Sequence, residues 1–183
     1  MEYGFTPLFR KTSRPGFNLK GRKNMNRNEQ EGFSLIELLI VVAIIGIIAS
    51  IAIPNLLASR RAANEGSAQS SLRTIQSCEI TYQATSGRGD YGDLAALRGN
   101  FLTDMVLGSG SKSGYNFAVS PTPPGDRPAL FYATAVPTIT SGIGQTGTRR
   151  FGMSEDGVLH GDSAALTAYA DEAAVKAAPP VGN

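Results

Sequence analysis

Residues 33–53, FSLIELLIVVAIIGIIASIAI, decide how the rest of the chain is interpreted. Glu37 is the only charged residue in this run of 21 residues. At a rise of about 1.5 Å per residue, a helix of that length covers about 30 Å, which is the thickness of a bilayer's hydrocarbon core. A carboxylate inside such a segment is costly and usually functional. The stretch therefore predicts a membrane-spanning helix that carries one functional acid.

The residues just before the run indicate a partner for that acid. Glu31-Gly32-Phe33 has the form of a processing site. A cut after Gly32 would give Phe33 a new α-amine four residues before Glu37. That amine is a candidate positive partner for the buried carboxylate.

These residues also carry a family resemblance. Gly32-Phe33-Ser34-Leu35-Ile36-Glu37, followed by a long aliphatic helix, resembles the type IV prepilin signature of type IV pilins and type II secretion pseudopilins. The resemblance covers roughly Glu31 to Ala63, and beyond that it is one of layout. It implies cleavage after Gly32 by a membrane prepilin peptidase, which also N-methylates Phe33. It further implies a structural subunit whose Glu37 acts in filament assembly, paired with the Phe33 amine of a neighbouring subunit.

Charge is distributed unevenly along the chain. Residues 1–32 carry seven Lys/Arg and three Asp/Glu, a net charge of +4, whereas residues 33–183 carry ten and twelve, a net charge of −2. A nucleic-acid interpretation of the overall charge of +2 therefore fails, and no nucleic-acid partner is inferred. Five basic residues precede the apolar run within 20 residues, and only Arg60 and Arg61 follow it closely; the five are Arg14, Lys20, Arg22, Lys23 and Arg27. This asymmetry predicts a cytoplasmic N-terminus and an external C-terminal part.

Other interpretations of the N-terminus remain open. An ordinary secretory signal peptide has an apolar core of about 7–15 residues, and Ser50-Ile51-Ala52 offers a small-residue cleavage site, so a secreted binding domain is one alternative. Glu37 would interrupt that core for no reason. A plain transmembrane anchor explains the length of the run but not the Gly-Phe…Glu pattern. The leader, residues 1–32, is long, and we hypothesise that Met25 is the true start.

Gly46 and Pro54 interrupt the apolar helix. Glycine weakens a helix interior by about 1 kcal/mol and proline by about 3 kcal/mol. Close helix packing is the structural explanation for Gly46, with Ser50 as a second small residue, and a kink is the explanation for Pro54. Both positions match the pilin pattern, which implies that the stretch between them loses helical structure when a subunit enters a filament.

The chain as a whole is predicted to be α+β. One long helix, residues 33–84, has a membrane half and an amphipathic half packed on a small antiparallel β-sheet head, residues 85–183. The amphipathic half has an apolar face formed by Ala58, Ala62, Ala68, Leu72, Ile75 and Tyr82, with Ser71 on another face. A short helical turn is expected at 94–97, strands at 115–119, 130–136, 148–153 and 158–160, and a flexible turn at 108–114. The tail at 164–183 is expected to be poorly ordered, with room for a helical turn or two at 164–178.

No catalytic motif is visible, so we do not expect an enzyme. His160 is expected to be a structural residue, and Cys78 has no partner for an intrachain disulfide because it is the only cysteine. No metal site is expected, although acidic loop residues leave calcium as a minor possibility; they are Asp90, Asp93, Glu155, Asp156 and Asp162.

The sequence therefore predicts a type IV pilus-like filament subunit, anchored in the bacterial inner membrane before assembly. Its expected partners are identical or related subunits, the prepilin peptidase, the inner-membrane assembly platform and the lipid bilayer. The first alternative is a pseudopilin of type II secretion, in a short periplasmic filament. The sequence does not separate these two, nor a major from a minor subunit, nor adhesion from motility or DNA uptake.

Overall fold

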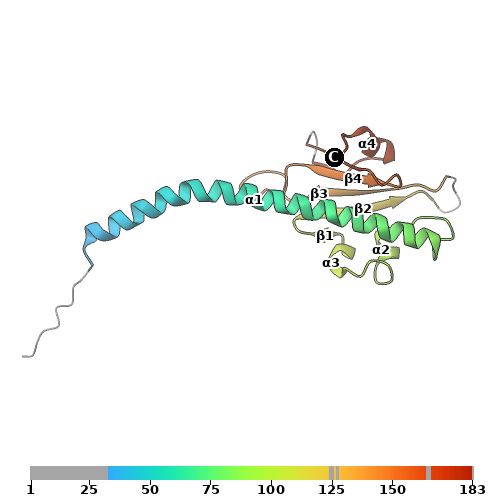
Figure 1. Cartoon of the computed structure of the whole chain (residues 1–183), viewed down its shortest axis with the longest axis horizontal. Helices are drawn as coiled ribbons and strands as arrows, with labels where there is room; N and C mark the ends of the chain where they lie inside the picture. Colours follow the sequence, from blue (N-terminus) through green and yellow to red (C-terminus); the bar gives the residue numbers. More distant parts are fainter. Residues whose placement is uncertain (1–32, 124–125, 127, 164–165, 183) are drawn as a thin grey trace, which may run out of the picture. The chain divides into compact units, whose positions relative to one another are not determined.

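The computed structural model describes residues 33–123, 126, 128–163 and 166–182. The leader expected at residues 1–32, with Gly32 and the alternative start Met25, lies outside the described residues. The elements follow one another as one long helix, two short helices, five strands and a last short helix (Figure 1). This is the α+β fold that the sequence predicts.

Helix α1, Leu35–Ala84, is a single helix of 50 residues. It ends at Ala84 because glycines follow closely: Gly87 donates its N–H to the Tyr82 carbonyl at 2.7 Å, and Gly89 donates to the Gln83 carbonyl at 3.0 Å. Gly89 has a φ of 95°, a conformation that residues with a Cβ rarely adopt. The carbonyls of the last turn thus gain partners, and the chain reverses towards the head.

The head contains one antiparallel sheet in which the strands follow their order in the chain, β1-β2-β3-β4-β5. The central register pairs Phe117 with Ala135, Ala135 with Phe151, and Phe151 with Gly161. The strand bounds are Ser111–Lys112 (β1), Tyr115–Pro121 (β2), Phe131–Pro137 (β3), Arg150–Ser154 (β4) and Leu159–Asp162 (β5).

The core of the head lies between α1 and one face of this sheet, as Figure 1 shows. Ala68, Leu72 and Ile75 of α1 are fully buried against aromatic and small side chains of the strands. The strand residues that share this core are Tyr115, Phe117, Phe131, Ala133, Ala135, Phe151, Met153 and Leu159. Their alternate spacing in β3 and β4 places them on one face, as a half-buried strand requires.

A second, smaller core covers the opposite face of the sheet. Helix α4, Glu172–Ala177, buries Val175 completely, next to Tyr169 and Ala178. Gly152 of β4 allows this close approach, because a Cβ there would lie 2.9 Å from Val175 Cγ1 and 3.0 Å from the Tyr169 ring. The sheet is therefore sandwiched between α1 and α4.

The prediction of a poorly ordered tail at 164–183 is wrong for its described part, 166–182. Asp171 caps α4 by accepting the Ala174 N–H at 2.7 Å, and Lys176 pairs with Glu155 at 2.6 Å. Helix α4 lies within 164–178, where the sequence allowed a helical turn or two, but the Ala-rich composition gave no sign of the buried residues Tyr169, Val175 and Ala178.

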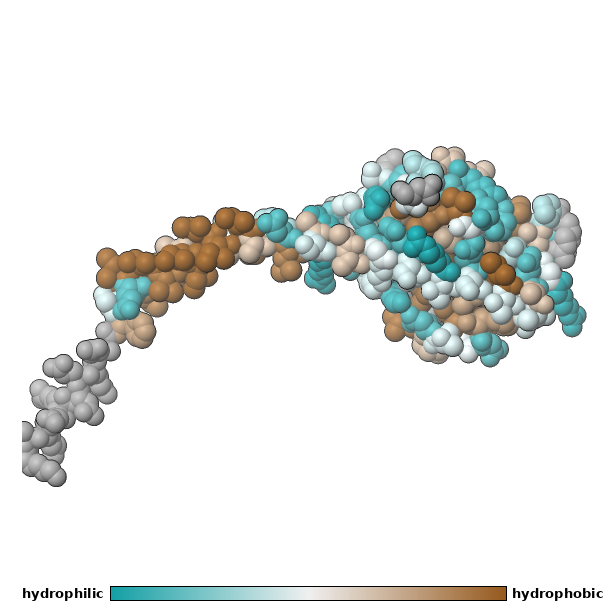
Figure 2. All heavy atoms as spheres, viewed as in Figure 1, coloured by the Kyte–Doolittle hydropathy of each residue, from teal (hydrophilic) through white to brown (hydrophobic). Residues whose placement is uncertain are grey.

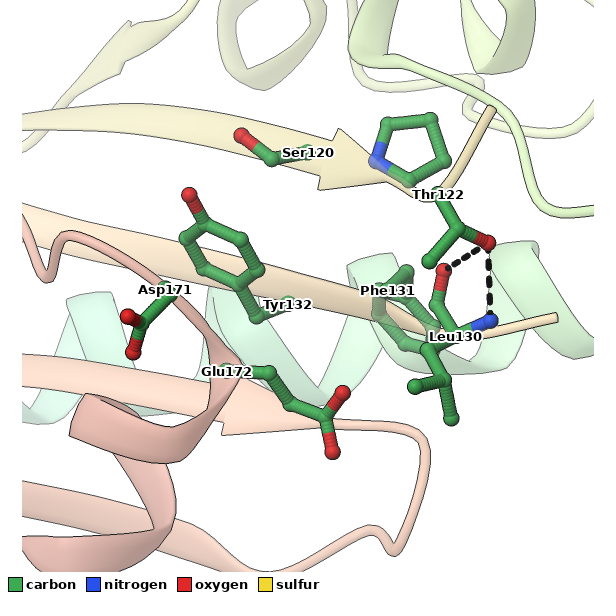
Figure 3. Close-up of a pocket in the computed structure, with 8 residues that line it drawn as sticks. Ser120, Thr122, Leu130, Phe131, Tyr132, Asp171 and Glu172 are labelled. Atoms are coloured by element: carbon green, nitrogen blue, oxygen red, sulfur yellow. Dashed lines mark hydrogen bonds between the residues drawn. The ribbon is translucent and has the colours of Figure 1, made fainter. Parts of the chain in front are cut away.

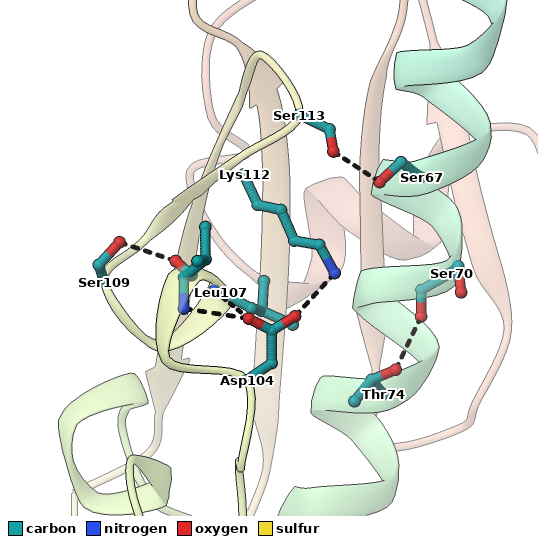
Figure 4. Close-up of polar contacts among 9 residues, drawn as sticks. Ser67, Ser70, Thr74, Asp104, Leu107, Ser109, Lys112 and Ser113 are labelled. Atoms are coloured by element: carbon teal, nitrogen blue, oxygen red, sulfur yellow. Dashed lines mark hydrogen bonds and ion pairs between the residues drawn. The ribbon is translucent and has the colours of Figure 1, made fainter.

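The predicted flexible turn at 108–114 is also wrong, because it contains β1, which pairs with β2. The two short helices are α2, Leu94–Leu97, where a helical turn was predicted, and α3, Met105–Gly108, which was not predicted. Asp104 caps α3 by accepting two N–H groups at 3.0 Å, and its other oxygen accepts Lys112 Nζ at 2.8 Å (Figure 4). Ser67 of α1 donates to Ser113 at 2.9 Å, which ties the β1 turn to the long helix.

The predicted apolar face of α1 is confirmed only in part. Ala68, Leu72 and Ile75 are buried, but Ala58 and Ala62 are exposed, and Ser71 is buried where an exposed position was expected. The sheet covers only the part of α1 that follows Asn64, so earlier alanines on the same face have nothing to pack on within the described residues.

We predict that Val175→Ala lowers the free energy of unfolding of the head by about 2 kcal/mol, because it removes two buried methyl groups and leaves a cavity over Gly152. The matched control is Ala173→Ser at an exposed position of the same helix, which should change stability by less than about 0.5 kcal/mol. Urea unfolding of the full chain in detergent measures both, and equal stability of the two variants would show that α4 adds nothing to the fold.

Candidate functional site

Glu37 lies in the first turn of α1, and Phe33 lies two residues before the helix begins at Leu35. Phe33 is 85% exposed, and Glu37 is also exposed. The Ser34 carbonyl accepts the Leu38 N–H at 3.1 Å, so the helix is formed from its first turn. Glu37 stands where the unpaired N–H groups of a helix favour negative charge. Its carboxylate has no ion pair with any residue that the structure describes.

The side chains that follow Glu37 form a continuous apolar surface, seen as the brown stretch of α1 in Figure 2. Large aliphatic side chains from Leu35 to Ile53 are 46–75% exposed. In the described part of the chain, α1 is also the one helix that is long and apolar enough to span a membrane. Such a surface is much larger than a soluble monomer leaves open to water, so it fits anchoring in a membrane or burial among other helices.

The helix is unbroken at Gly46 and Pro54. A Cβ at Gly46 would meet no atom within 4 Å, so nothing in the described chain requires glycine there. Side chains supply hydrogen bonds around Pro54, which has no N–H of its own. Asn55 Nδ2 donates to the Ile51 carbonyl at 3.0 Å, and Ser50 Oγ donates to the Ile47 carbonyl at 2.7 Å.

Glu65 fixes α1 to the loop before β4. One of its oxygens accepts both the N–H of Thr148, at 2.8 Å, and the Thr148 hydroxyl, at 2.7 Å. The other accepts Arg149 Nε at 3.0 Å. Burial alone would raise the pKa of Glu65, but these hydrogen bonds and the Arg149 charge outweigh it and lower the pKa below its ordinary value. Glu65 is therefore ionised at neutral pH and binds the sheet to the helix.

Glu79 lies four turns further along α1, and its pKa is shifted in the opposite direction from that of Glu65. It is 0% exposed and accepts one hydrogen bond, from the Gly92 N–H at 3.0 Å. Its second oxygen is buried with no hydrogen-bond partner among the described residues. Burial raises the pKa of Glu79 to about 7, and the nearby charge of Asp93 adds to this while the Gly92 N–H opposes it. Glu79 thus changes protonation close to neutral pH.

Sequence reasoning missed both glutamates, although a signal was present. Positions 65, 68, 72, 75 and 79 are spaced by three and four residues, which is the spacing of one buried helix face. Because charged residues are rarely buried unless they are paired, they were not considered as members of that face.

His160 and Cys78 occupy structural positions. His160 is buried in β5, and its Nδ1 lies 2.6 Å from the Ala178 carbonyl, which joins the sheet to the end of α4. The Cys78 thiol donates to the Phe101 carbonyl at 3.2 Å, and burial raises its pKa, so the unreactive thiol form is favoured.

The acidic loop residues are used in local structure. Asp93 caps α2, Asp156 accepts from Ser154 and from the Val158 N–H, and Asp162 binds Arg150 through two oxygens at 3.0 Å. Across the described residues there is no group of three acidic, histidine or cysteine side chains placed to hold a metal ion.

A shallow hollow of about 220 Å³ lies beside the ends of β2 and β3 (Figure 3). Its polar side chains already have partners: Thr122 bonds to Leu130, Tyr132 donates to the Ala170 carbonyl, and Glu172 pairs with Lys176. Asp171 is the cap of α4. We assign no chemistry to this hollow.

Comparison with known proteins identifies the N-terminal part of the chain. Residues 27–53 match the family described as the prokaryotic N-terminal methylation motif. The chain carries a prepilin-type N-terminal segment.

The relatives of the chain include type IV pilins and a type II secretion protein. The chain is 66% identical over 35 residues to the type IV wide pilus major component PilA4 of Thermus thermophilus, covering 19% of this chain and 27% of that protein. It is 41% identical over 64 residues to the type IV major pilin protein PilA of Myxococcus xanthus, covering 35% of this chain and 28% of that protein. It is 31% identical over 64 residues to the type II secretion system core protein G of Aeromonas hydrophila, covering 35% of this chain and 45% of that protein.

The matches thus span less than half the length of these relatives and at most 35% of this chain. No solved structure matches the chain at a significant level. The prediction of a pilin or pseudopilin resemblance is confirmed.

We predict that Glu79 makes the head less stable as pH rises from about 4.5 to about 7. Its folded pKa is raised to about 7 from an ordinary value of 4.5, so the folded state holds a proton that the unfolded chain has lost in this window. The full shift corresponds to up to about 3 kcal/mol. Glu65, whose pKa is lowered, has the opposite effect on stability: it makes the head less stable as pH falls, and only below about pH 4.5.

The variant Glu79→Gln keeps the acceptor for the Gly92 N–H but cannot titrate. Urea unfolding of the wild type and of this variant at pH 5 and pH 7.5 gives the comparison. The wild type should lose stability between these pH values relative to Glu79→Gln. Parallel pH profiles of the two proteins would contradict a raised pKa.

Proposed function

We propose that this chain is a structural subunit of a type IV pilus-like filament, matured by cleavage after Gly32 and N-methylation of Phe33. The observation that carries the proposal is the combination in α1 of an uncovered apolar surface with one carboxylate, Glu37, at its start. The match of residues 27–53 to the N-terminal methylation motif supports it, as does the similarity to two type IV pilins. The relatives are structural subunits, and an enzymatic role is not proposed.

Before assembly, α1 anchors the subunit in the inner membrane with its N-terminus in the cytoplasm. The basic residues that precede the apolar run, compared with the pair Arg60 and Arg61 after it, support this orientation. The prepilin peptidase and an inner-membrane assembly platform act on the subunit in this state. Extraction from the lipid then transfers the apolar surface into a bundle of α1 helices from related subunits.

In that bundle Glu37 pairs with the Phe33 amine of a neighbouring subunit. An unpaired charge buried among apolar helices costs several kcal/mol, so the pair sets the register of one subunit on the next. The stretch between Gly46 and Pro54 is the part of α1 that loses helical structure on assembly. Glycine weakens a helix interior, a Cβ at Gly46 would gain no contact within 4 Å, and Pro54 has no N–H to donate to the helix.

A pseudopilin of type II secretion is the second candidate, favoured by the similarity to core protein G of Aeromonas hydrophila. Both candidates use the same maturation and assembly chemistry. They differ in outcome, because deletion of the gene removes surface filaments in the first case and blocks protein export in the second.

We predict that Gly32→Val leaves the full-length precursor in the membrane, because a branched side chain at the scissile position blocks close approach of the backbone to the peptidase. Gel mobility and N-terminal sequencing of the membrane fraction measure this. The control is Gly66→Ala, whose added methyl meets no atom within 4 Å and which should mature normally. A free Phe33 terminus in Gly32→Val would refute the assigned cleavage site.

We predict that Glu37→Ala and Glu37→Gln are cleaved and inserted normally but form few filaments. Loss of the charge makes insertion no harder, whereas it leaves the neighbour's Phe33 amine unpaired in the filament. The filament yield should fall by about tenfold or more, since about 1.4 kcal/mol is a factor of ten in an equilibrium constant.

Electron microscopy and membrane fractionation test this prediction, with Glu172→Gln in the head as a matched removal of one carboxylate charge. In mixtures with the wild type, the Glu37 variants should enter filaments poorly. Abundant and normal filaments from Glu37→Ala would mean that this carboxylate has another role.

A further inference from the structure

We propose that the loop 139–146 and Arg60 form a lipid-binding surface that holds the head against the bilayer before assembly. The inference rests on the proposed membrane anchoring and adds a second contact with lipid, made by the head itself. The occupant is the headgroup region of the leaflet from which α1 emerges.

The loop carries uncovered apolar side chains. Ile143 is 85% exposed, more than any other large apolar residue in the described part of the head, and Ile139 is 47% exposed. Residues 138–147 contain no charged side chain. An uncharged loop with exposed isoleucines among small polar residues can insert those side chains at the boundary between headgroups and acyl chains.

The loop is held in a fixed shape by its own hydrogen bonds. The Thr146 N–H donates to the Ile139 carbonyl at 3.0 Å, and Gln145 Nε2 donates to the Thr140 carbonyl at 3.1 Å. Ile143 is therefore presented at the tip of a closed loop and does not depend on a change of shape to reach outward.

The loop is also fixed to α1 at a defined position along the helix axis, by hydrogen bonds to two helix side chains. Arg61 Nη1 donates to Gln145 Oε1 at 3.2 Å, and Asn64 Nδ2 donates to the Thr146 carbonyl at 2.9 Å. A groove of about 240 Å³ separates the loop from the helix, lined by Leu57 and Arg60 on one side and by Ile139, Ile143 and Thr146 on the other.

The groove reaches the level of the membrane surface at Leu57, whereas the hydrogen bonds at Arg61 and Asn64 lie about 12 Å and about 16 Å beyond Ile53. The apolar run ends at Ile53, so Leu57 and Arg60 lie about 6 Å and about 10 Å further along the helix axis. The polar region on each side of the hydrocarbon core is about 5–7 Å thick. Side chains on a helix lean towards its N-terminus, so the exposed guanidinium of Arg60 points back towards the lipid phosphates.

The charges around the groove complement a phosphate-rich surface. Arg60 is exposed and Arg61 lies next to it, and residues 43–64 contain no acidic residue that would neutralise them. Glu65, the next acid along α1, is already bonded to Arg149. Apolar insertion at Ile143 and cation–phosphate attraction at Arg60 therefore act on the same surface.

The experiment measures whether residue 143 lies in lipid or in water when the chain is in a membrane. The full chain carrying Cys78→Ser and Ile143→Cys is labelled with an environment-sensitive fluorophore and placed at high lipid dilution in vesicles of phosphatidylcholine with a fraction of phosphatidylglycerol. The matched control is Ser86→Cys in the same background, an exposed position just after the distant end of α1. Resistance to carbonate extraction shows separately whether the chain is membrane-inserted.

We expect a blue-shifted emission at position 143 and a several-fold stronger quenching by shallow spin-labelled lipids than at position 86. Adding Arg60→Gln should weaken the quenching at 143 and leave position 86 unchanged. Emission at 143 as water-like as at 86, in a chain that resists extraction, would overturn this inference alone. A blue shift that disappears as the protein is diluted would assign the surface to a second copy of the chain and also overturn it. A chain that is extracted by carbonate would contradict the membrane anchoring itself.

Discussion

Burial of the apolar first half of α1 is the constraint on which the rest of the structure depends. From Leu35 to Ile53 the helix presents aliphatic side chains on all sides, and the described part of the chain offers nothing that covers them. At about 25 cal/mol for each Å² of apolar surface, leaving such a segment in water is strongly unfavourable. The second half of the same helix has an apolar stripe on one side only, and the sheet of the head covers it. One continuous helix therefore has two apolar surfaces that need to be covered, and among the described residues only the surface on its second half is covered.

Three carboxylates along α1 reflect this division. Glu65 is satisfied inside the head by Thr148 and Arg149, which makes it a fixed attachment between helix and sheet. Glu79 is buried with a single N–H donor and keeps its proton up to a pKa of about 7, so its charge is avoided by protonation. Glu37 has no ion pair like that of Glu65 and is not buried like Glu79 among the described residues. In an apolar surrounding it requires a positive charge from elsewhere, and under the proposed maturation the Phe33 amine of a neighbouring subunit would supply that charge.

The features that could be predicted from the sequence are those fixed by long patterns. A run of 21 residues with one charge, and strands rich in aromatic and β-branched residues, led to the long helix and to four of the five strands. The features that were missed depend on single contacts across the fold. Strand β1 has two residues and exists because β2 lies beside it, and α4 depends on Val175 fitting over Gly152. The buried state of Glu65 and Glu79 depends on donors from Thr148 and Gly92, which are distant in sequence or lie beyond a turn and leave no periodic signal.

We propose that the chain is processed so that Phe33 becomes its first residue and supplies the amine that Glu37 needs. The intact mass and N-terminal peptide sequence of the protein isolated from membranes of its native host measure this directly. We expect a chain that begins at Phe33 and carries one methyl group on its α-amine. A mature protein that begins near Ile53, or one that keeps residues before Phe33, would contradict it.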